Sequence, residues 1–186
     1  MTEKEKMLSG EMYNPLDPEL DRDRHEARLL FQQINGLDED RKEERNELFS
    51  KLLPNTASGL WIEPPFYCDY GYNIYSGKNL FMNFDCCILD VMPVRLGNNV
   101  MMGPKVQLYT ATHPLEAKAR NSGREFAKGI TIGNNVWIGG GAVICPGVTI
   151  GDGVVIGAGS VVTRNLPDNV FAAGSPARVF KQIDND

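Results

Sequence analysis

Charge is almost absent from one stretch of this 186-residue chain. Residues 129–163 contain ten of the 19 glycines, many Val and Ile residues, and a single charged side chain, Asp152. A flexible Gly-rich linker would be polar and would not carry so many β-branched apolar residues. The stretch is therefore expected to be folded and packed.

The chain also lacks the marks of a membrane, secreted or nucleic-acid-binding protein. No run approaches the roughly 18 consecutive apolar residues of a membrane span, and the start MTEKEKMLSGEM has no apolar signal-peptide core. A net charge of −5 argues against a nucleic-acid binder, which needs a basic face for phosphates. We expect a soluble cytoplasmic protein that binds neither nucleic acid nor membranes.

Cysteines are few, and their spacing is not that of a metal site. Cys68, Cys86, Cys87 and Cys145 match no zinc-ligand pattern, and the adjacent pair would point to opposite faces of a strand. The sequence shows no export signal that would place it in an oxidising compartment, so disulfide bonds are not expected. Reduced, half-buried cysteines are therefore predicted.

The first 58 residues are predicted to form a helical arm. Periodic apolar residues indicate helices over residues 21–35 and 39–53, with Pro18 near the start of the first helix and Pro54 ending the second. Most of the many charges of this segment are expected to form solvated helical faces.

From residue 59 to 170 the dominant pattern is a six-residue repeat of apolar side chains. Positions 132, 138, 144, 150, 156 and 162 are all Ile or Val, and positions 82, 88, 96, 102 and 108 keep the period apart from a two-residue slip after 88. Such a period fits a coil of three short strands, with Gly or Asn supplying the positive φ of the corners. We predict a mainly β fold, a parallel β-helix with 18 residues per coil.

A dinucleotide-binding loop is a weak alternative for the same glycines. The fragments Gly151-Asp-Gly and Gly157-Ala-Gly stay in period with their surroundings, and no long helix follows them.

One segment, residues 109–129, departs from the repeat with the sequence YTATHPLEAKARNSGREFAKG. Long excursions from a regular scaffold are usually functional or disordered. This excursion contains His113, one of only two histidines, and imidazole titrates near neutral pH, as a general base should. We predict that His113 is catalytic, whereas His25 in the charged arm is expected to be solvated.

Several motifs together resemble the maltose and galactoside O-acetyltransferases. They are the hexads, the Thr-Ala-Thr-His-Pro run before residue 115, the run ITIGNNVWIG, the closing AGSPAR and the amino-terminal EKMLSGEMY. The resemblance implies a left-handed parallel β-helix with an amino-terminal helical arm and a short carboxyl-terminal helix in residues 171–186. General chirality rules would favour a right-handed coil, so the left hand is expected from the resemblance alone.

The resemblance also implies an activity and an assembly. Members transfer an acetyl group from acetyl-CoA to a sugar hydroxyl and form homotrimers with sites between subunits. His113 matches the catalytic histidine of the family. Asp69 and Asn83 match acceptor-contacting positions, although a structural asparagine at a coil corner is a competing interpretation for Asn83.

Two further acidic residues are less directly matched. Asp17 would close the acceptor pocket from the arm, but only after a gap in the alignment. Asp90 lies beside a further sugar-contacting acid of the family, whose ungapped match is Val91. This departure argues against galactoside specificity.

For acetyl-CoA the resemblance implies backbone groups of Gly140 and Ala158, with the Gly140 N–H as an oxyanion donor. It also implies a cluster of polar and basic side chains where the coils end: Thr163, Arg164, Arg178 and Lys181. Arg178 and Lys181 could instead be solvated residues of the expected carboxyl-terminal helix. Trp137 is expected to flank the cofactor groove or to pack in a core or interface.

No metal is expected, because the zinc carbonic anhydrases on the same scaffold use three histidines and this chain has two. Two alternatives remain open: acetylation of another small acceptor, such as a galactoside, a serine or an antibiotic hydroxyl, or an amine, and a non-catalytic β-solenoid that acts as a binding module.

Overall fold

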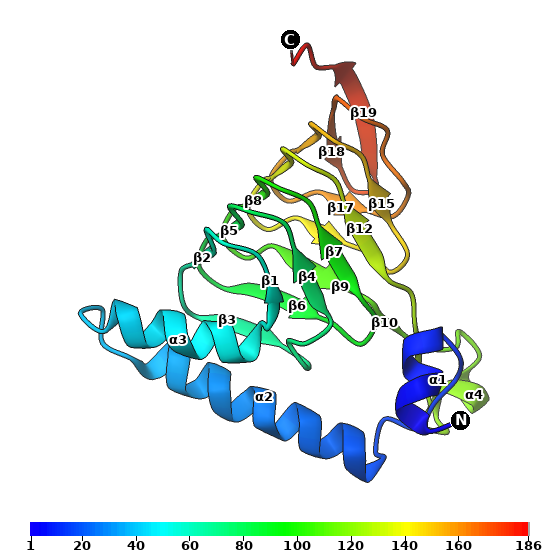
Figure 1. The fold of residues 1–186 in the computed structure, drawn as a ribbon. Coiled ribbons are helices and arrows are strands. Elements are labelled where there is room, and N and C mark those ends of the chain that lie inside the picture. Colours follow the sequence, from blue (N-terminus) through cyan, green and yellow to red (C-terminus); the bar gives the residue numbers. More distant parts are fainter. Residues whose placement is uncertain (186) are drawn as a thin grey trace.

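The chain climbs as a three-sided coil in a computed structural model that describes residues 1–185 (Figure 1). The first sheet contains β1 (Asn55–Thr56), β4 (Ile74–Ser76), β7 (Val94–Leu96), β12 (Ile130–Ile132) and β15 (Thr149–Ile150). The second contains β2 (Trp61–Ile62), β5 (Phe81–Met82), β8 (Met101–Met102), β13 (Trp137–Ile138), β16 (Val155–Ile156), β18 (Val170–Gly174) and β19 (Ala177–Gln182). The third contains β3 (Phe66–Cys68), β6 (Cys86–Leu89), β9 (Gln107–Tyr109), β14 (Val143–Ile144) and β17 (Val161–Val162).

Successive coils pair in parallel, as a β-helix requires, but their length changes along the axis. Ser76 pairs with Leu96, twenty positions later, whereas Ile132 pairs with Ile150, eighteen later, and Ile150 bridges to Leu166, sixteen later. The predicted 18-residue coil therefore applies to the later part, and the early coils hold two more residues each.

The core is a stack of inward aliphatic side chains. The first positions of the six later hexads are all at most 1% exposed: Ile132, Ile138, Ile144, Ile150, Ile156 and Val162. Each lies over its counterpart in the neighbouring coil, at the roughly 4.7 Å spacing of paired strands. Full burial of one such side chain stabilises the fold by about 1.5–3 kcal/mol.

Asparagine forms one corner of the coil. Asn79, Asn99 and Asn135 have φ angles of 60°, 55° and 56°, in the left-handed region where asparagine is tolerated. The Nδ2 of Asn79 donates to Oδ1 of Asn99, and Asn99 donates in the same way to Asn135, each at 2.9 Å. These bonds tie successive corners together, as the predicted Gly and Asn turns require.

Two helices cover the amino-terminal end of the coil (Figure 1). Helix α2 (Pro18–Gly36) starts at Asp17, whose carboxylate accepts the Glu19 N–H at 3.0 Å, and α3 (Lys42–Leu52) ends just before Pro54. Both helices were expected; their apolar residues Ile34, Phe49 and Leu52 are buried in the main core. The coil starts at Asn55, four positions before the expected boundary.

The short helix α1 (Glu3–Ser9) was not expected, because seven residues are too few for a periodic signal. Its start is fixed by a capping box between Thr2 and Glu5. In Figure 1 it lies beside α4 (Ala117–Arg120), a short helix in the excursion.

The expected carboxyl-terminal helix is wrong, because Ala177–Gln182 form the strand β19. No further coil stacks on β18, so its outer backbone groups would be left unpaired. The chain turns at Gly174, with φ of 100°, and β19 pairs antiparallel with β18. Residue 186 lies outside the described residues.

The four cysteines are free, and Cys86 is buried while Cys87 is half-buried, so the pair points to opposite faces as expected. Across residues 1–185, none of the helices combines the length and apolarity that crossing a bilayer would need.

Substitution of Gly71 tests how tightly the helical cap fits the first coil. Gly71 has φ of +79°, and a Cβ there would lie 2.2 Å from the Leu52 carbonyl oxygen. Gly71→Ala should lower the free energy of unfolding by more than about 2 kcal/mol. Gly36→Ala is the control: it lies in α2 with open space around it and should stabilise by about 0.5–1 kcal/mol. Equal urea midpoints for the two variants would contradict this fit.

Candidate functional site

His113 lies at the start of the excursion, at the corner between the third and first sheets. It follows β10 (Ala111–Thr112), which pairs antiparallel with β11 (Phe126–Ala127). Its Nδ1 lies 3.4 Å from the Arg124 carbonyl oxygen. Because a carbonyl can only accept a hydrogen bond, this contact favours the tautomer with the proton on Nδ1. The exposed Nε2 is then free to take a proton.

Glu125 and Tyr13 join His113 in a chain of polar contacts that the sequence patterns did not indicate. The Oε2 of Glu125 lies 3.7 Å from His113 Nε2, and Oε1 accepts a hydrogen bond from the Tyr13 hydroxyl. Tyr13 and Glu125 are 112 positions apart, and no motif connects them. The only feature of the sequence that could have pointed to Glu125 is its location in the polar excursion.

Asp69 lies at the same corner of the coil, directly after β3. Burial and, second to it, the nearby Glu125 charge raise the pKa of this half-buried carboxyl to about 6, while Arg24 and Arg28 of α2 oppose the shift. His113, Glu125 and Asp69 therefore form one electrostatic neighbourhood beside the arm. A half-buried carboxylate of this kind can accept hydrogen bonds from a polyol.

Asp90 does not belong to the acceptor surface, which corrects the expectation that it contacts a sugar. It is 0% exposed, and its carboxylate accepts the backbone N–H groups of Asp69 at 3.0 Å, Tyr70 at 2.9 Å and Asn73 at 3.2 Å. Burial still raises its pKa to about 7, against the effect of these hydrogen bonds. The neighbouring Val91 is 3% exposed, so neither side chain can reach an acceptor. Asp90 instead shapes the turn that carries Asp69.

Asp17 has a structural role at the start of α2, because one of its oxygens caps the helix. Arg24 of the same helix links this region to the corner of the coil. Its Nη2 donates to the Pro15 carbonyl at 2.6 Å, and its Nη1 donates to the Tyr70 hydroxyl at 2.9 Å.

A groove of about 440 Å³ runs along the other side of the molecule, from the second sheet to the corner between the second and third sheets. Outward side chains of paired strands form its apolar floor: Phe81, Met101, Trp137, Val155 and Phe171. Asn83, Gly140 and Ala158 line its corner. Four residues named from the sequence, including Trp137, thus meet in one groove.

Glycines at this corner allow the backbone nitrogens of the next coil to approach the glycine backbone closely. A Cβ at Gly103 would lie 2.6 Å from the Gly140 nitrogen, and one at Gly139 would lie 2.5 Å from the Ala158 nitrogen. Among the described residues, neither the Gly140 nor the Ala158 N–H has an acceptor. Both residues line the groove, so these N–H groups are available as donors to a bound oxygen. The Asn83 Oδ1 accepts the Phe84 N–H at 2.8 Å, so this side chain also shapes its turn.

The four residues expected to cluster where the coils end lie on two different elements, so this part of the expectation is corrected. Lys181 pairs with Phe171 and Arg178 pairs with Ala173, which places both cations on the groove side of the second sheet. Thr163 and Arg164 follow β17 of the third sheet instead. All four side chains are exposed.

His113 is not among the residues that line the groove. The groove follows the corner between the second and third sheets, whereas His113 lies at the corner between the third and first sheets. A single chain therefore presents a histidine at one corner and free backbone donors at another.

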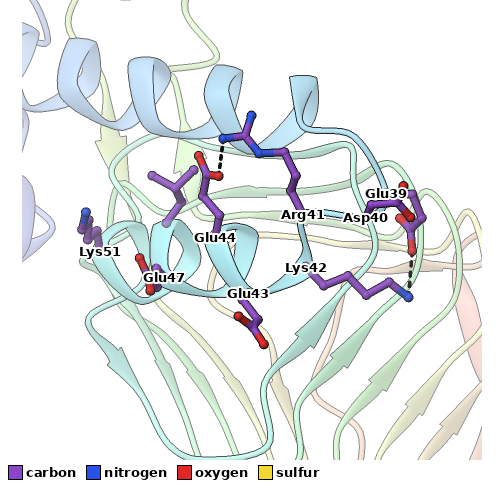
Figure 2. Close-up of a pocket in the computed structure, with 9 residues that line it drawn as sticks. Glu39, Asp40, Arg41, Lys42, Glu43, Glu44, Glu47 and Lys51 are labelled. Atoms are coloured by element: carbon purple, nitrogen blue, oxygen red, sulfur yellow. Dashed lines mark ion pairs between the residues drawn. The ribbon is translucent and has the colours of Figure 1, made fainter.

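A further hollow of about 910 Å³ lies along α3, lined largely by charged side chains (Figure 2). Arg41 pairs with Glu44, and Lys42 pairs with Glu39 at 2.9 Å. These two ion pairs lie among other charged side chains, as on a solvated helical face. Within residues 1–185, no three His, Cys, Asp or Glu side chains form a group that could hold a metal ion.

Comparison with known proteins finds likeness along the whole chain. Residues 6–57 match the family description "Maltose acetyltransferase hexapeptide capping motif", and residues 129–164 match "Bacterial transferase hexapeptide (six repeats)". The crystal structure of a maltose O-acetyltransferase from Clostridium difficile 630 is 49% identical, with a TM-score of 0.97 over 100% of this chain and 99% of that chain.

Two further relatives are galactoside acetyltransferases. A structure of one in complex with coenzyme A is 39% identical, with a TM-score of 0.96 over 100% of this chain and 92% of that chain. The galactoside O-acetyltransferase of Escherichia coli K12 is 40% identical over 97% of this chain and 89% of its own length. These likenesses confirm the expected left-handed β-helix.

The raised pKa of Asp69 predicts a pH-dependent effect of Asp69→Asn. Because the folded-state pKa of about 6 exceeds the ordinary value near 4, the wild-type protein loses stability as the pH rises between these values. Asp69→Asn removes this loss and should raise the free energy of unfolding by about 1–2 kcal/mol at pH 8, with little gain at pH 4. Urea unfolding at both pH values measures this; an equal gain at both would contradict it.

Proposed function

The chain belongs to the maltose and galactoside O-acetyltransferase family of hexapeptide-repeat transferases, and on that premise we propose that it moves an acetyl group from acetyl-CoA to a sugar hydroxyl. The observation that carries this proposal is that two corners of the coil each present one set of the groups that acetyl transfer needs. One corner presents His113 with Glu125, and the other presents an apolar groove with free backbone donors.

The groove suits the donor. Its apolar floor fits the long chain of coenzyme A, and the cations Arg178 and Lys181 on β19 would attract the phosphates. Thr163 and Arg164 on the third sheet would complete these contacts from a second chain. The relative solved with coenzyme A supports this choice of donor.

His113 would act as the general base. Its Nε2 takes the proton of the acceptor hydroxyl, whose oxygen attacks the thioester carbonyl carbon. The Gly140 N–H would stabilise the resulting oxyanion. When the carbon–sulfur bond breaks, the imidazolium returns the proton to the coenzyme A thiolate. The Glu125 carboxylate, 3.7 Å away, would stabilise the imidazolium between these two steps.

The site needs a second copy of the chain, because the base and the groove lie at different corners of one chain. We propose a homotrimer in which His113 of one subunit faces the groove of its neighbour. The apolar outer side of the second sheet supports this assembly: Trp61 is 59% exposed and Trp137 is 52% exposed. Asp69, with Asp17 from the arm, would then bind the acceptor from the side of His113, and Asn83 from the side of the groove.

The acceptor is proposed to be a maltose-like or glucose-like sugar. Its hydroxyls match the carboxylate of Asp69 and the amide of Asn83. The family's further acid is absent from this corner, because Val91 stands at its position and the neighbouring Asp90 is buried. We also propose a cytoplasmic location, which the four free cysteines support.

His113→Ala tests the assigned base. Thiol release from acetyl-CoA should be measured with maltose, glucose, galactosides and a hydroxyl-bearing antibiotic. Wild-type protein should release thiol with maltose or glucose, and His113→Ala should lower kcat by about 10²–10⁴-fold. The control His25→Ala alters the other histidine, which is exposed on α2, and should retain activity. No release with any acceptor would refute the activity, and full activity of His113→Ala would refute the base.

Mixed oligomers test whether each site is shared. His113→Ala and Asn83→Ala chains, each inactive alone, should be co-expressed in equal amounts. If His113 and Asn83 of one site come from different subunits, about a quarter of the sites regain both groups by random assembly. Activity near that fraction of wild type is expected, whereas no recovery would show that both groups act within one chain.

A further inference from the structure

The excursion that carries His113 has few attachments to the coil. Ala111 pairs with Ala127 and Thr112 with Phe126, and the Lys128 N–H donates to the Thr110 carbonyl at 2.9 Å. Most side chains from residue 115 to 124 are exposed. The coil therefore fixes where the excursion begins and ends, but it does little to fix the residues around the base.

The amino-terminal arm supplies a further attachment. Tyr13 donates its N–H to the Glu125 carbonyl at 3.0 Å and accepts the Glu125 N–H at 3.3 Å, an antiparallel bridge between arm and excursion. The side chain of Tyr13 is 0% exposed. It packs in a second apolar cluster, separate from the main core, with Met7, Leu20, Tyr70, Val91 and Ala127.

The Tyr13 hydroxyl holds one end of the Glu125 carboxylate. It donates to Oε1, while Oε2 lies 3.7 Å from His113 Nε2. Burial and the Glu125 charge raise the pKa of the Tyr13 phenol, so the hydroxyl keeps its proton and remains a donor. Among the described residues, Tyr13 and His113 are the polar side-chain partners of this carboxylate.

Other charged groups near this contact come from different elements. Asp69 follows β3, and Arg24 and Arg28 lie on α2. The two arginines act through space on the Asp69 carboxylate, and within residues 1–185 neither of them donates a hydrogen bond to Glu125. A Glu125 side chain without the phenol contact would be free to rotate toward solvent, away from the imidazole.

We propose that Tyr13 is a positioning residue: its buried hydroxyl holds the Glu125 carboxylate beside His113, so that the amino-terminal arm sets the environment of the base. This inference rests on the proposed function of His113. The arm would then have two tasks, because α2 and α3 close the end of the coil while the segment from α1 to Tyr13 orders the base.

Tyr13→Phe is the direct test, because it keeps the ring in its cluster and removes only the hydroxyl. Tyr72→Phe is the matched control: Tyr72 packs against the same cluster and donates to Asp23 Oδ2 at 3.0 Å, away from His113. The ¹⁵N resonances of the two imidazoles report the result, and His25 serves as the internal reference. Tyr13→Phe should shift the His113 Nε2 resonance and leave His25 unchanged, whereas Tyr72→Phe should shift neither.

Glu125→Gln gives a second test of the same contact, because it keeps the shape of the side chain and removes its charge. It should also shift the His113 Nε2 resonance. These spectra do not depend on acetyl transfer, so a chain that proves inactive with every acceptor would still test the contact. An unchanged His113 resonance in Tyr13→Phe or in Glu125→Gln would overturn the proposal.

Kinetics separate positioning from general destabilisation. Tyr13→Phe should lower kcat about fivefold, the effect expected from the loss of one hydrogen bond. The KM for acetyl-CoA should not change, because the groove lies at another corner. In a Glu125→Gln background Tyr13→Phe should have no further effect on kcat. An equal loss in both backgrounds, or a rise in KM alone, would show that Tyr13 does not act through Glu125.

Discussion

The stacking of each coil on the one below is the interaction on which the rest of the structure depends. Inward aliphatic side chains lie over one another, and parallel backbone pairing keeps them in register from β1 to β18. The same register places Gly103 under Gly140 and Gly139 under Ala158. The free N–H donors of the groove are thus held by the scaffold itself, which suits them to a transition state whose charge must be met without rearrangement.

A regular stack leaves little room for charge in its interior, so the polar side chains of the proposed site lie where the stack is interrupted or ends. His113 is in the excursion, Asp69 is at a corner beside the arm, and the cations of β19 lie beyond the last coil. Asp90 shows what a buried acid requires: three backbone N–H groups surround its carboxylate. It acts on the acceptor corner only by shaping the turn that carries Asp69.

The separation of base and groove gives the assembly a chemical meaning. One chain carries two halves of the proposed site, and in the proposed trimer each half meets the other half of a neighbour. The arm contacts both the coil and the excursion: α2 and α3 cover the open end of the core, and Tyr13 contacts Glu125 in the excursion. Burial of the hydrophobic end of the coil and order at the base therefore depend on the same first 53 residues.

The sequence by itself determined the repeating coil, the two long helices of the arm, the excursion and the histidine within it. Each of these is a local pattern: a period of six, an amphipathic period, a break in the repeat, or a rare residue type. The tertiary structure alone decided the burial of Asp90, the strand at the carboxyl terminus, the division of the basic cluster and the contact of Tyr13 with Glu125. These features depend on which distant segments meet: β19 forms because β18 is left with an open edge, and Asp90 is buried because the turn after β3 folds over it. Such long-range contacts produce no local sequence pattern: Tyr13 and Glu125 are in contact although they lie 112 positions apart.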